Sequence, residues 1–447
     1  MALENIILSK EEIDKIFPYK YVLIILLILK DIFDNYFNYR QYKRIKENRP
    51  IPKELISIGI DQKNHEESNK YSQAKLEYNI ISSLIQNSID LLLIFFNFYP
   101  FEYNISKKLC TYFPLIHFDP ENEYGPLNLF ILLELLRAEV ISLPFESYET
   151  FVLEEKFGFN KTTPKTFIKD QIKTLLLFCI FLPPVLSLFV YIIIKGGKYF
   201  YIFSEILFII IIFVFLWIYP NFIQPLFNKF KDLEEGELKE GIFNLAKRVN
   251  YPLTKIYEMD QSERSSHSNA YLFGFGKNKR IVLYDTLIKN LQKEEIIGVL
   301  GHELGHWKKY HFIANLTFVL SIVFIFFYFL KFYLMEKTIF VNFGFEQQSV
   351  FIGLFLFFLI YSPIFYFITI LQYFMTRKFE YQADNFACEL GYGEELKSAL
   401  KKLSEENKSN LDPDPLYSIV NYSHPTLIER VRAINKFQEN KNNKKEN

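Results

Sequence analysis

Cysteine and net charge are both scarce in this sequence. Only three of its 447 residues are cysteines, Cys110, Cys179 and Cys388, and they lie far apart with no CxxC pair. This excludes a disulfide-rich secreted scaffold and a cysteine-based zinc site. The 51 Lys and Arg residues balance the 51 Asp and Glu residues, so charge gives no reason to propose a nucleic-acid partner. Residues 1–17 lack the features of a signal peptide, and we expect none to be removed.

Long apolar runs are the most prominent feature of the chain. A helix that spans a bilayer needs about 20 mostly apolar residues, and seven segments fit. The four that are nearly free of charge are residues 175–194, 199–219, 312–334 and 350–371. The three that carry charged residues are 19–39, 79–98 and 127–145. Charges in hydrocarbon are costly, so we expect them to face protein or enclosed water, or to lie near span ends. For residues 127–145, a core helix of a soluble domain is the alternative.

The positions of Lys and Arg predict the topology. They are abundant in the first and third loops between spans and sparse in the second and fourth. By the positive-inside rule, the N-terminus then lies outside the cytosol and the C-terminus inside it. We therefore predict an all-α polytopic membrane protein with seven spans and a cytosolic-side domain containing a small β-hairpin. The predicted segments are 1–219 (spans one to five), 220–311 (first cytosolic segment), 312–371 (spans six and seven), 372–437 (second cytosolic segment) and 438–447 (disordered tail).

The first candidate for chemistry is an HExxH motif in residues 302–306. His302 and His306 are four residues apart in a run that reads as helix, so both imidazoles lie on one face and can bind one tetrahedral ion. Glu303 projects beside them and is the natural general base for a water bound to zinc, an ion that lowers the pKa of that water to about 7. The alternative is a helix whose histidines are only capped or solvated.

Two protein ligands are too few for a catalytic zinc ion, which usually has three. Glu380 and Asp384 offer carboxylates, again four residues apart on a predicted helix just beyond the seventh span. One carboxylate can bind the metal while the other orients a ligand histidine. Taken alone, the pair also fits a solvated acidic face. The predicted hairpin of spans six and seven favours the metal site, because it returns the chain to the depth of His302 and His306. The cytosolic segments 220–311, with the HExxH helix, and 372–437, with the third ligand, are therefore predicted to form a zinc metalloprotease domain.

Two further segments are candidates for substrate contact. Residues 268–284 read as a β-hairpin, and its exposed edge at Asn269, Ala270 and Tyr271 could hold an extended peptide by strand addition. An ordinary packing hairpin is the alternative. His424 and Arg430 could donate to a developing oxyanion, although a surface histidine that caps a helix explains His424 as well.

The other histidines gave no candidate ligand. His311 is not four residues from either motif histidine, so it does not share their helix face, and we expect it to lie at the membrane interface. His65 and His117 read as loop residues with no role, and His267 is close to the motifs only in sequence.

Taken together, the motifs resemble those of the type 1 CAAX prenyl endopeptidases, integral-membrane zinc proteases of the endoplasmic reticulum and nuclear envelope. The resemblance extends over most of residues 40–430. Its motifs are FESYETF (145–151) with EEKFGFNK (154–161), QPLF (224–227), SNAY (268–271), HELGHW (302–307), FEYQAD (379–384) and SHP (423–425). The HExxH element alone is generic, but six motifs in this order are specific.

The resemblance implies a fold, a reaction and a set of residue roles. Seven helices would enclose a water-filled chamber in the bilayer, with a zinc ion (Zn2+) facing inward near the cytosolic side. The substrates would be proteins ending in a prenylated CaaX sequence, whose last three residues are removed, and some members cut at a further upstream site. The implied roles are zinc binding by His302, His306 and Glu380, general base catalysis by Glu303, support of the ligands by Asp384, and substrate or transition-state contact by Asn269, His424 and Arg430.

Two other functions fit part of the pattern. An HtpX-type quality-control metalloprotease shares HExxH and the later glutamate but has fewer spans. A catalytically silent membrane scaffold would keep the fold without the reaction. The sequence predicts neither the natural substrate nor the oligomeric state.

Overall fold

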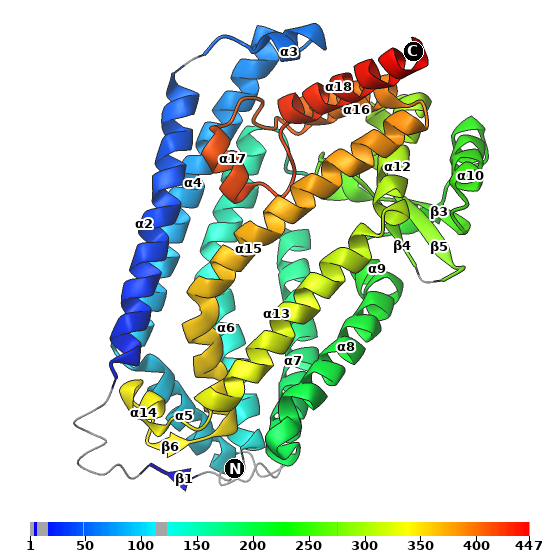
Figure 1. The fold of residues 1–447 in the computed structure, drawn as a ribbon. Helices are drawn as coiled ribbons and strands as arrows, with labels where there is room; N and C mark the ends of the chain where they lie inside the picture. The colour runs from blue at the N-terminus through cyan, green and yellow to red at the C-terminus, as the bar shows by residue number, and fades with distance from the viewer. Residues whose placement is uncertain (1–3, 7–16, 48, 113–122, 275, 447) are drawn as a thin grey trace.

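The computed structural model describes residues 4–6, 17–47, 49–112, 123–274 and 276–446, and most of them are helical (Figure 1). The longer helices are α2 (Tyr19–Lys46), α4 (Gln62–Phe95), α5 (Phe98–Tyr112), α6 (Tyr124–Tyr148), α7 (Pro164–Lys195), α8 (Phe200–Ile218), α10 (Glu237–Val249), α12 (Lys293–Lys308), α13 (His311–Tyr333), α15 (Val350–Glu389), α16 (Gly393–Glu406) and α18 (Leu427–Glu446). The short ones are α3 (Lys53–Ser57), α9 (Gln224–Phe227), α11 (Asp285–Asn290), α14 (Lys337–Asn342) and α17 (Pro415–Asn421).

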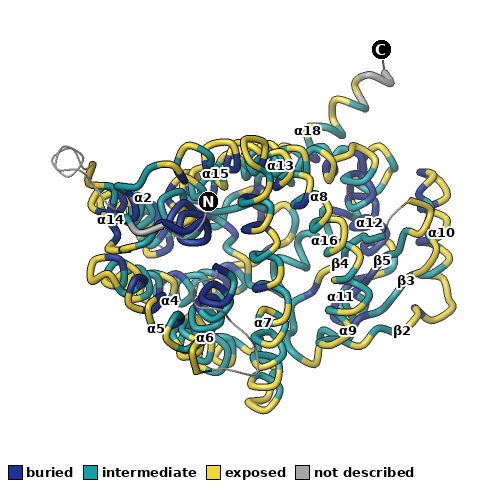
Figure 2. Tube along the Cα trace, turned by 90° about the horizontal axis from the view of Figure 1, so that it is seen from below, coloured by how far each residue is buried: buried dark blue, intermediate teal, exposed yellow. Residues whose placement is uncertain are grey.

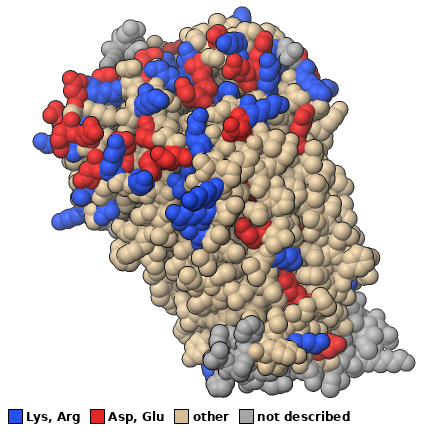
Figure 3. All heavy atoms as spheres, turned by 180° about the vertical axis from the view of Figure 1, so that it is seen from behind, with Lys and Arg blue, Asp and Glu red and all other residues tan. Residues whose placement is uncertain are grey.

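Five helical stretches in the described residues are long and apolar enough to cross a membrane. They are α4, α7, α13, α15 and the stretch Gly197–Phe227, which contains α8. Each overlaps a predicted span. Helices also form at the other two predicted spans, α2 and α6, but charged side chains interrupt their apolar stretches. On the face shown in Figure 3, most Lys, Arg, Asp and Glu side chains gather at the end of the molecule that carries α10 and α16, and only a few are visible below it.

Several charged side chains of α2 and α6 have polar partners inside the protein. Asp34 Oδ1 accepts a hydrogen bond from the Tyr366 hydroxyl of α15 at 3.1 Å. Arg137 pairs with Glu134 on its own helix, and its Nε lies 3.7 Å from Glu102 Oε2 on α5. Such pairing is expected where a charge would otherwise meet hydrocarbon.

Buried apolar side chains form two main cores. The larger one joins α6, α7, α13 and α15 near α14, and Phe130, Phe340 and Phe357 are among its fully buried side chains. The second lies between the small sheet, α10, α12 and α16, and includes Ile242, Ile281 and Leu300. Figure 2 shows buried residues gathered near α14 and near α12, with exposed residues along the outer sides of the helices.

The main sheet has four described strands in the order β2, β3, β5, β4. Their bounds are β2 Phe230–Asp232, β3 Leu253–Met259, β4 Ala270–Phe273 and β5 Lys279–Tyr284. β3 and β5 are parallel and the other pairs antiparallel. The predicted hairpin is confirmed as β4 and β5, with Ala270 opposite Leu283. A separate two-stranded pair joins β1 (Glu4–Asn5) to β6 (Gln347–Gln348).

Two expectations about secondary structure differ from the structure. Helix α18 continues to Glu446 where the composition predicted a disordered tail. Contacts with α15 and α16 hold this part of α18 in place: Gln438 packs near Gly393 of α16, and Lys441 Nζ donates to the Cys388 carbonyl of α15 at 3.3 Å. His65 lies inside α4 and not in a loop; it is 3% exposed, and its Nε2 is 3.1 Å from the Asn69 side chain.

Candidate metal centre

Helix α12 carries the HExxH residues. A capping box fixes its start, because the Gln292 side chain accepts from the Glu295 amide and the Glu295 carboxylate accepts from the Gln292 amide. Both exchanges satisfy amides that a helix start leaves unpaired. His302 and His306 then follow on one face, their ring centroids 4.8 Å apart.

Helix α15 brings the carboxylates to this face. A glycine permits the close approach: a Cβ at Gly305 would lie 2.9 Å from the Ala383 Cα and 3.1 Å from its carbonyl oxygen. Glu380 and Asp384 are on either side of this contact. Two residue pairs, each spaced by one helical turn, therefore face each other across the interface between α12 and α15.

His302, His306 and Glu380 form a group in which one ligand atom from each residue lies within 4.8 Å of the others. His302 Nε2 is 3.5 Å from Glu380 Oε2, and His306 Nε2 is 3.3 Å from Glu380 Oε1. Two imidazoles and one carboxylate are the donors of many catalytic zinc sites, which leave a fourth position open.

Three observations support the fit of a metal ion to this group. Glu380 Oε2 is buried and accepts no hydrogen bond from the described residues. The Nε2 atoms of His302 and His306 lie only 3.1 Å apart, so their lone pairs repel each other unless a proton or a cation lies between them. His302 Nδ1 is 2.8 Å from Asp384 Oδ1. A carboxylate only accepts, so Nδ1 carries the hydrogen and the lone pair of Nε2 faces the group.

Arg430 of α18 holds Asp384 in place. Its Nε is 2.9 Å from Asp384 Oδ2, its Nη2 is 2.5 Å from Oδ1, and Asp384 is fully buried. Its Nη1 is 3.6 Å from Glu380 Oε2. The structure therefore brings Arg430 to the site, with two of its nitrogens engaged by Asp384.

Glu303 follows the first ligand directly and is half-buried. Burial raises the pKa of its carboxyl above the ordinary value, and Glu380 adds to the rise, while His302, His306 and Arg430 oppose it. A carboxylate with a raised pKa is a better proton acceptor near neutral pH.

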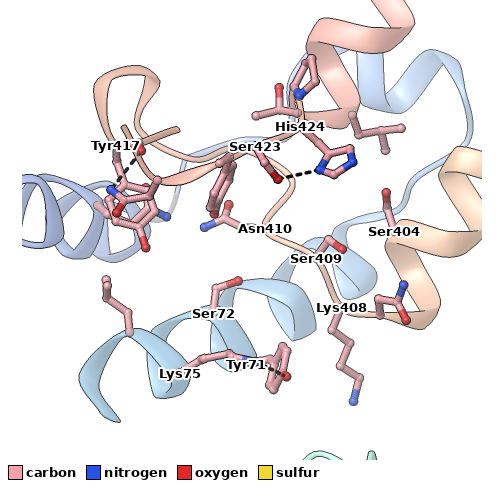
Figure 4. A pocket seen from close by; sticks show the side chains of 18 of the residues that line it. Tyr71, Ser72, Lys75, Ser404, Lys408, Ser409, Asn410, Tyr417, Ser423 and His424 are labelled. Atoms are coloured by element: carbon pink, nitrogen blue, oxygen red, sulfur yellow. Dashed lines mark hydrogen bonds between the residues drawn. The ribbon is translucent and has the colours of Figure 1, made fainter. Parts of the chain in front are cut away.

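His424 reaches the site from the loop between α17 and α18. Its Nε2 lies 3.4 Å from Glu380 Oε1, and its Nδ1 is 2.9 Å from the Ser423 hydroxyl. It also lines a cavity of about 540 Å³ bounded by α4 and the segments that follow α16 and α17. Figure 4 shows Ser423 and His424 across this cavity from Tyr71, Ser72 and Lys75 of α4.

The hairpin residues Asn269, Ala270 and Tyr271 lie at the edge of the sheet that is next to α12. Among the described strands, β4 is the last of its sheet, and it contacts α12. Asn269 precedes β4 and its carbonyl accepts from the Tyr284 amide at 3.1 Å. Ala270 is buried, and the Tyr271 hydroxyl accepts a hydrogen bond from Gln224.

Sequence reasoning missed one histidine at the site. His311, for which the sequence predicted no part in the metal site, is 3% exposed, and its Nδ1 lies 3.0 Å from His306 Nδ1. Spacing gave no signal, because the turn at Tyr310 and not a continuous helix brings it back to His306. His267 lies away from the ligand group, stacked on Phe159 and lining the cavity. His117 lies outside the described residues.

Comparison with known proteins identifies the family. A family model described as the CAAX prenyl protease N-terminal region with five membrane helices matches residues 41–229, and peptidase family M48 matches residues 232–438. The chain is 41% identical to the CAAX prenyl protease 1 homolog of Arabidopsis thaliana, over 86% of this chain and 90% of the relative. The chain belongs to the CAAX prenyl protease 1 family. The human homolog is 37% identical, over 87% of this chain and 89% of its own length.

A solved structure of the family has the same fold. The crystal structure of S. mikatae Ste24p matches with a TM-score of 0.86 and 35% identity, covering 94% of this chain and 99% of that one. With the apolar helices and the ligand group, this membership makes the chain a multi-pass membrane metalloprotease of peptidase family M48.

Proposed function

We propose that this chain is a zinc-dependent endopeptidase that removes the last three residues of prenylated CaaX proteins, and that it also cuts some substrates further upstream. The observation that carries the proposal is the convergence of His302, His306 and Glu380 beside Glu303 in a chain whose relatives are named CAAX prenyl protease 1.

Zinc is the metal that this donor set suits best. His302, His306 and Glu380 would hold it, as two nitrogen donors and one oxygen donor with an open fourth position. When bound, such an ion polarises a carbonyl and lowers the pKa of a coordinated water. Asp384 keeps the His302 ring in the tautomer that can bind the ion.

The remaining roles belong to the protein's own side chains. Glu303 takes a proton from the attacking water and delivers it to the leaving amine, which its raised pKa favours. His424 and Arg430 face the same carboxylate, Glu380, and we assign them to stabilising negative charge on the scissile carbonyl oxygen.

The substrate peptide would run along β4 and end in the cavity beside His424. β4 is the strand of its sheet next to α12, so Asn269, Ala270 and Tyr271 offer backbone groups for strand addition. The lining of the cavity includes Lys75 and Lys408 and, among described residues, no Asp or Glu. Lys408 Nζ donates to the Phe157 carbonyl at 3.1 Å, and Lys75 Nζ lies 3.6 Å from Glu154 Oε1 and 3.8 Å from Glu149 Oε1. A lining without acidic side chains suits the negatively charged C-terminus of a CaaX peptide, with Lys75 as the cation nearest to it.

The arrangement in the membrane is inferred from where the charged side chains lie. We propose that α2 and α6 join the five apolar helices as spans, making seven around a water-filled chamber, because several of their charges, among them Asp34 and Arg137, have polar partners within the protein. The gathering of charge at the end that carries α10 and α16 supports placing the protease segments outside the hydrocarbon (Figure 3), and the Lys and Arg residues of the first and third loops between spans support the cytosolic side. The N-terminus would be lumenal and the C-terminus cytosolic, in the endoplasmic reticulum membrane or the nuclear envelope.

Two alternatives make different predictions. An HtpX-type protease is disfavoured by the match of residues 41–229 to the CAAX prenyl protease N-terminal region. A scaffold without activity would work unchanged after Glu303→Gln, whereas the enzyme should lose at least about a hundredfold in rate.

The test is cleavage of a defined substrate. Purified protein is incubated with a farnesylated CaaX peptide and with the same peptide lacking the lipid, each with and without a zinc chelator, and the products are identified by mass. We expect release of the tripeptide from the farnesylated peptide only without chelator, and loss of release in Glu303→Gln. Cleavage that persists with chelator, or no cleavage by protein that contains zinc, would refute the proposal.

A further inference from the structure

We propose that His311 and Gln382 position His306 as a metal ligand, through a chain of hydrogen bonds that fixes which nitrogen of His306 faces the ion. The inference rests on the metal site of the proposed function. It assigns a role to two residues outside the HExxH motif, neither of which reaches the metal position itself.

The backbone places His311 for this contact. Helix α12 ends at Lys308, and Tyr310 then adopts a left-handed conformation with φ of 58°. A bulky residue rarely takes this conformation, and such strain tends to persist where the surrounding structure requires it. The turn starts α13 at His311 and directs its ring back toward His306, which lies two residues before the end of α12.

The His311 ring is held rigidly. It is 3% exposed and stacks on Phe379 of α15 with a centroid distance of 4.2 Å and an interplanar angle of 7°. Phe379 directly precedes the third ligand, Glu380. The ring therefore lies between the helix that carries the imidazole ligands and the helix that carries the carboxylate ligand.

The direction of the hydrogen bonds follows from the donors and acceptors. His306 Nε2 faces Glu380 and His302, so its lone pair must be free for the metal, and the ring hydrogen is then on Nδ1. That hydrogen is donated to His311 Nδ1 at 3.0 Å. His311 consequently carries its own hydrogen on Nε2 and donates it to Gln382 Oε1 at 2.8 Å. The amide oxygen of Gln382 thus sets the tautomers of both rings.

The two imidazole ligands have different supports. His302 is backed by the carboxylate of Asp384, which Arg430 holds, whereas His306 is backed by the uncharged pair His311 and Gln382. Such outer partners orient a ligand and raise its basicity, and their loss typically weakens metal binding about 10- to 100-fold.

The experiment measures metal binding directly. His311→Phe keeps a ring for stacking on Phe379 but removes the acceptor, and Gln382→Leu removes the end of the chain, while Gln382→Glu retains an acceptor oxygen. We expect the zinc dissociation constant, from chelator competition on the purified full-length protein, to rise about 10- to 100-fold in His311→Phe and about tenfold in Gln382→Leu. Gln382→Glu should stay within about threefold of the wild type. In the cobalt-substituted protein, the first two variants should also shift the visible absorption.

A matched control separates this role from general stability. His65→Phe changes another histidine that is 3% exposed, far from the site in sequence, and should leave zinc affinity and the cobalt spectrum unchanged. Wild-type affinity and spectrum in His311→Phe, or equal affinities in Gln382→Leu and Gln382→Glu, would overturn the inference. If His311→Phe does not fold, the difference in zinc affinity between Gln382→Leu and Gln382→Glu tests the inference. A wild-type protein that binds no zinc would instead refute the metal site of the proposed function, and this inference with it.

Discussion

The two glycines of α12 allow a sharp test of how the ligand group is assembled. A Cβ at Gly305 would lie 2.9 Å from the Ala383 Cα and 3.1 Å from the Ala383 carbonyl oxygen, whereas a Cβ at Gly301 would have its nearest contact at 3.6 Å, with the Ala387 Cβ. Both positions are buried in the same helix. We predict that Gly305→Ala separates α12 from α15 and that Gly301→Ala does not.

The size of the effect follows from these contacts. Carbon atoms pack best at about 3.5–4.0 Å, and the backbone of Ala383 cannot rotate away, so the two helices must separate by roughly half an ångström. Overpacking of this kind costs about 1–3 kcal/mol of stability. A misplacement of about 1 Å can reduce a rate about a hundredfold, so a misplacement of about half an ångström should reduce kcat/KM about tenfold. Gly301→Ala should stabilise α12 by up to about 1 kcal/mol, because alanine favours a helix.

Thermal unfolding in detergent, zinc affinity and kcat/KM should be measured for both variants. We expect Gly305→Ala to lower all three and Gly301→Ala to leave zinc affinity and kcat/KM unchanged. The reasoning is refuted if the two variants behave alike, or if Gly305→Ala is destabilised but binds zinc and turns over substrate as the wild type does.

Four other outcomes follow from the structure. Asp384→Asn leaves the Arg430 guanidinium, 11% exposed, without its carboxylate, and should cost about 3 kcal/mol in a denaturation assay; unchanged stability would contradict the buried pair. Burial pushes the pKa of Glu295 upward, but its hydrogen bonds, first that from Lys402, hold it below the ordinary value. Its stabilisation is therefore complete above about pH 4.3 and lost as the pH falls through the lower folded-state pKa, so the Tm difference between wild type and Glu295→Gln should be full at pH 7 and narrow below about pH 4; a difference independent of pH would argue against an ionised Glu295. With free zinc at a hundred times its Kd, removal of the zinc should lower the free energy of unfolding by about 2.7 kcal/mol. We expect a lower Tm that added zinc, but not magnesium, restores. Lys75→Gln should raise KM for a peptide with a free C-terminal carboxylate and not for its amide; an equal change for both would exclude carboxylate recognition at Lys75.

The parts of the site that depend on local spacing could be predicted from the sequence. His302 and His306, and likewise Glu380 and Asp384, are one helical turn apart, and this spacing fixes a shared face whatever the rest of the fold does. The hairpin at residues 268–284 was also predicted, because two β-prone runs flank a glycine-rich turn.

The parts that depend on packing between distant segments could not be predicted. The close approach of α12 to α15 depends on Gly305 lying against Ala383, and neither residue indicates the other in sequence. His311 reaches His306 through the left-handed turn at Tyr310, where a glycine or asparagine would have been the recognisable signal. The tail was expected to be disordered from its composition, but its first turns are anchored on α15 and α16 and the helix extends from there.

Helix α15 continues without a break from Val350 in the apolar core to Glu389 beyond the metal ligand. At about 1.5 Å per residue it is a single rod about 60 Å long, with one end packed among the lipid-facing helices and Glu380 toward the other. The third ligand is consequently not part of a separable soluble module. A water-soluble fragment that lacks the membrane half of this rod loses the support that aims the carboxylate. Changes in bilayer thickness that tilt this helix should therefore also alter catalysis.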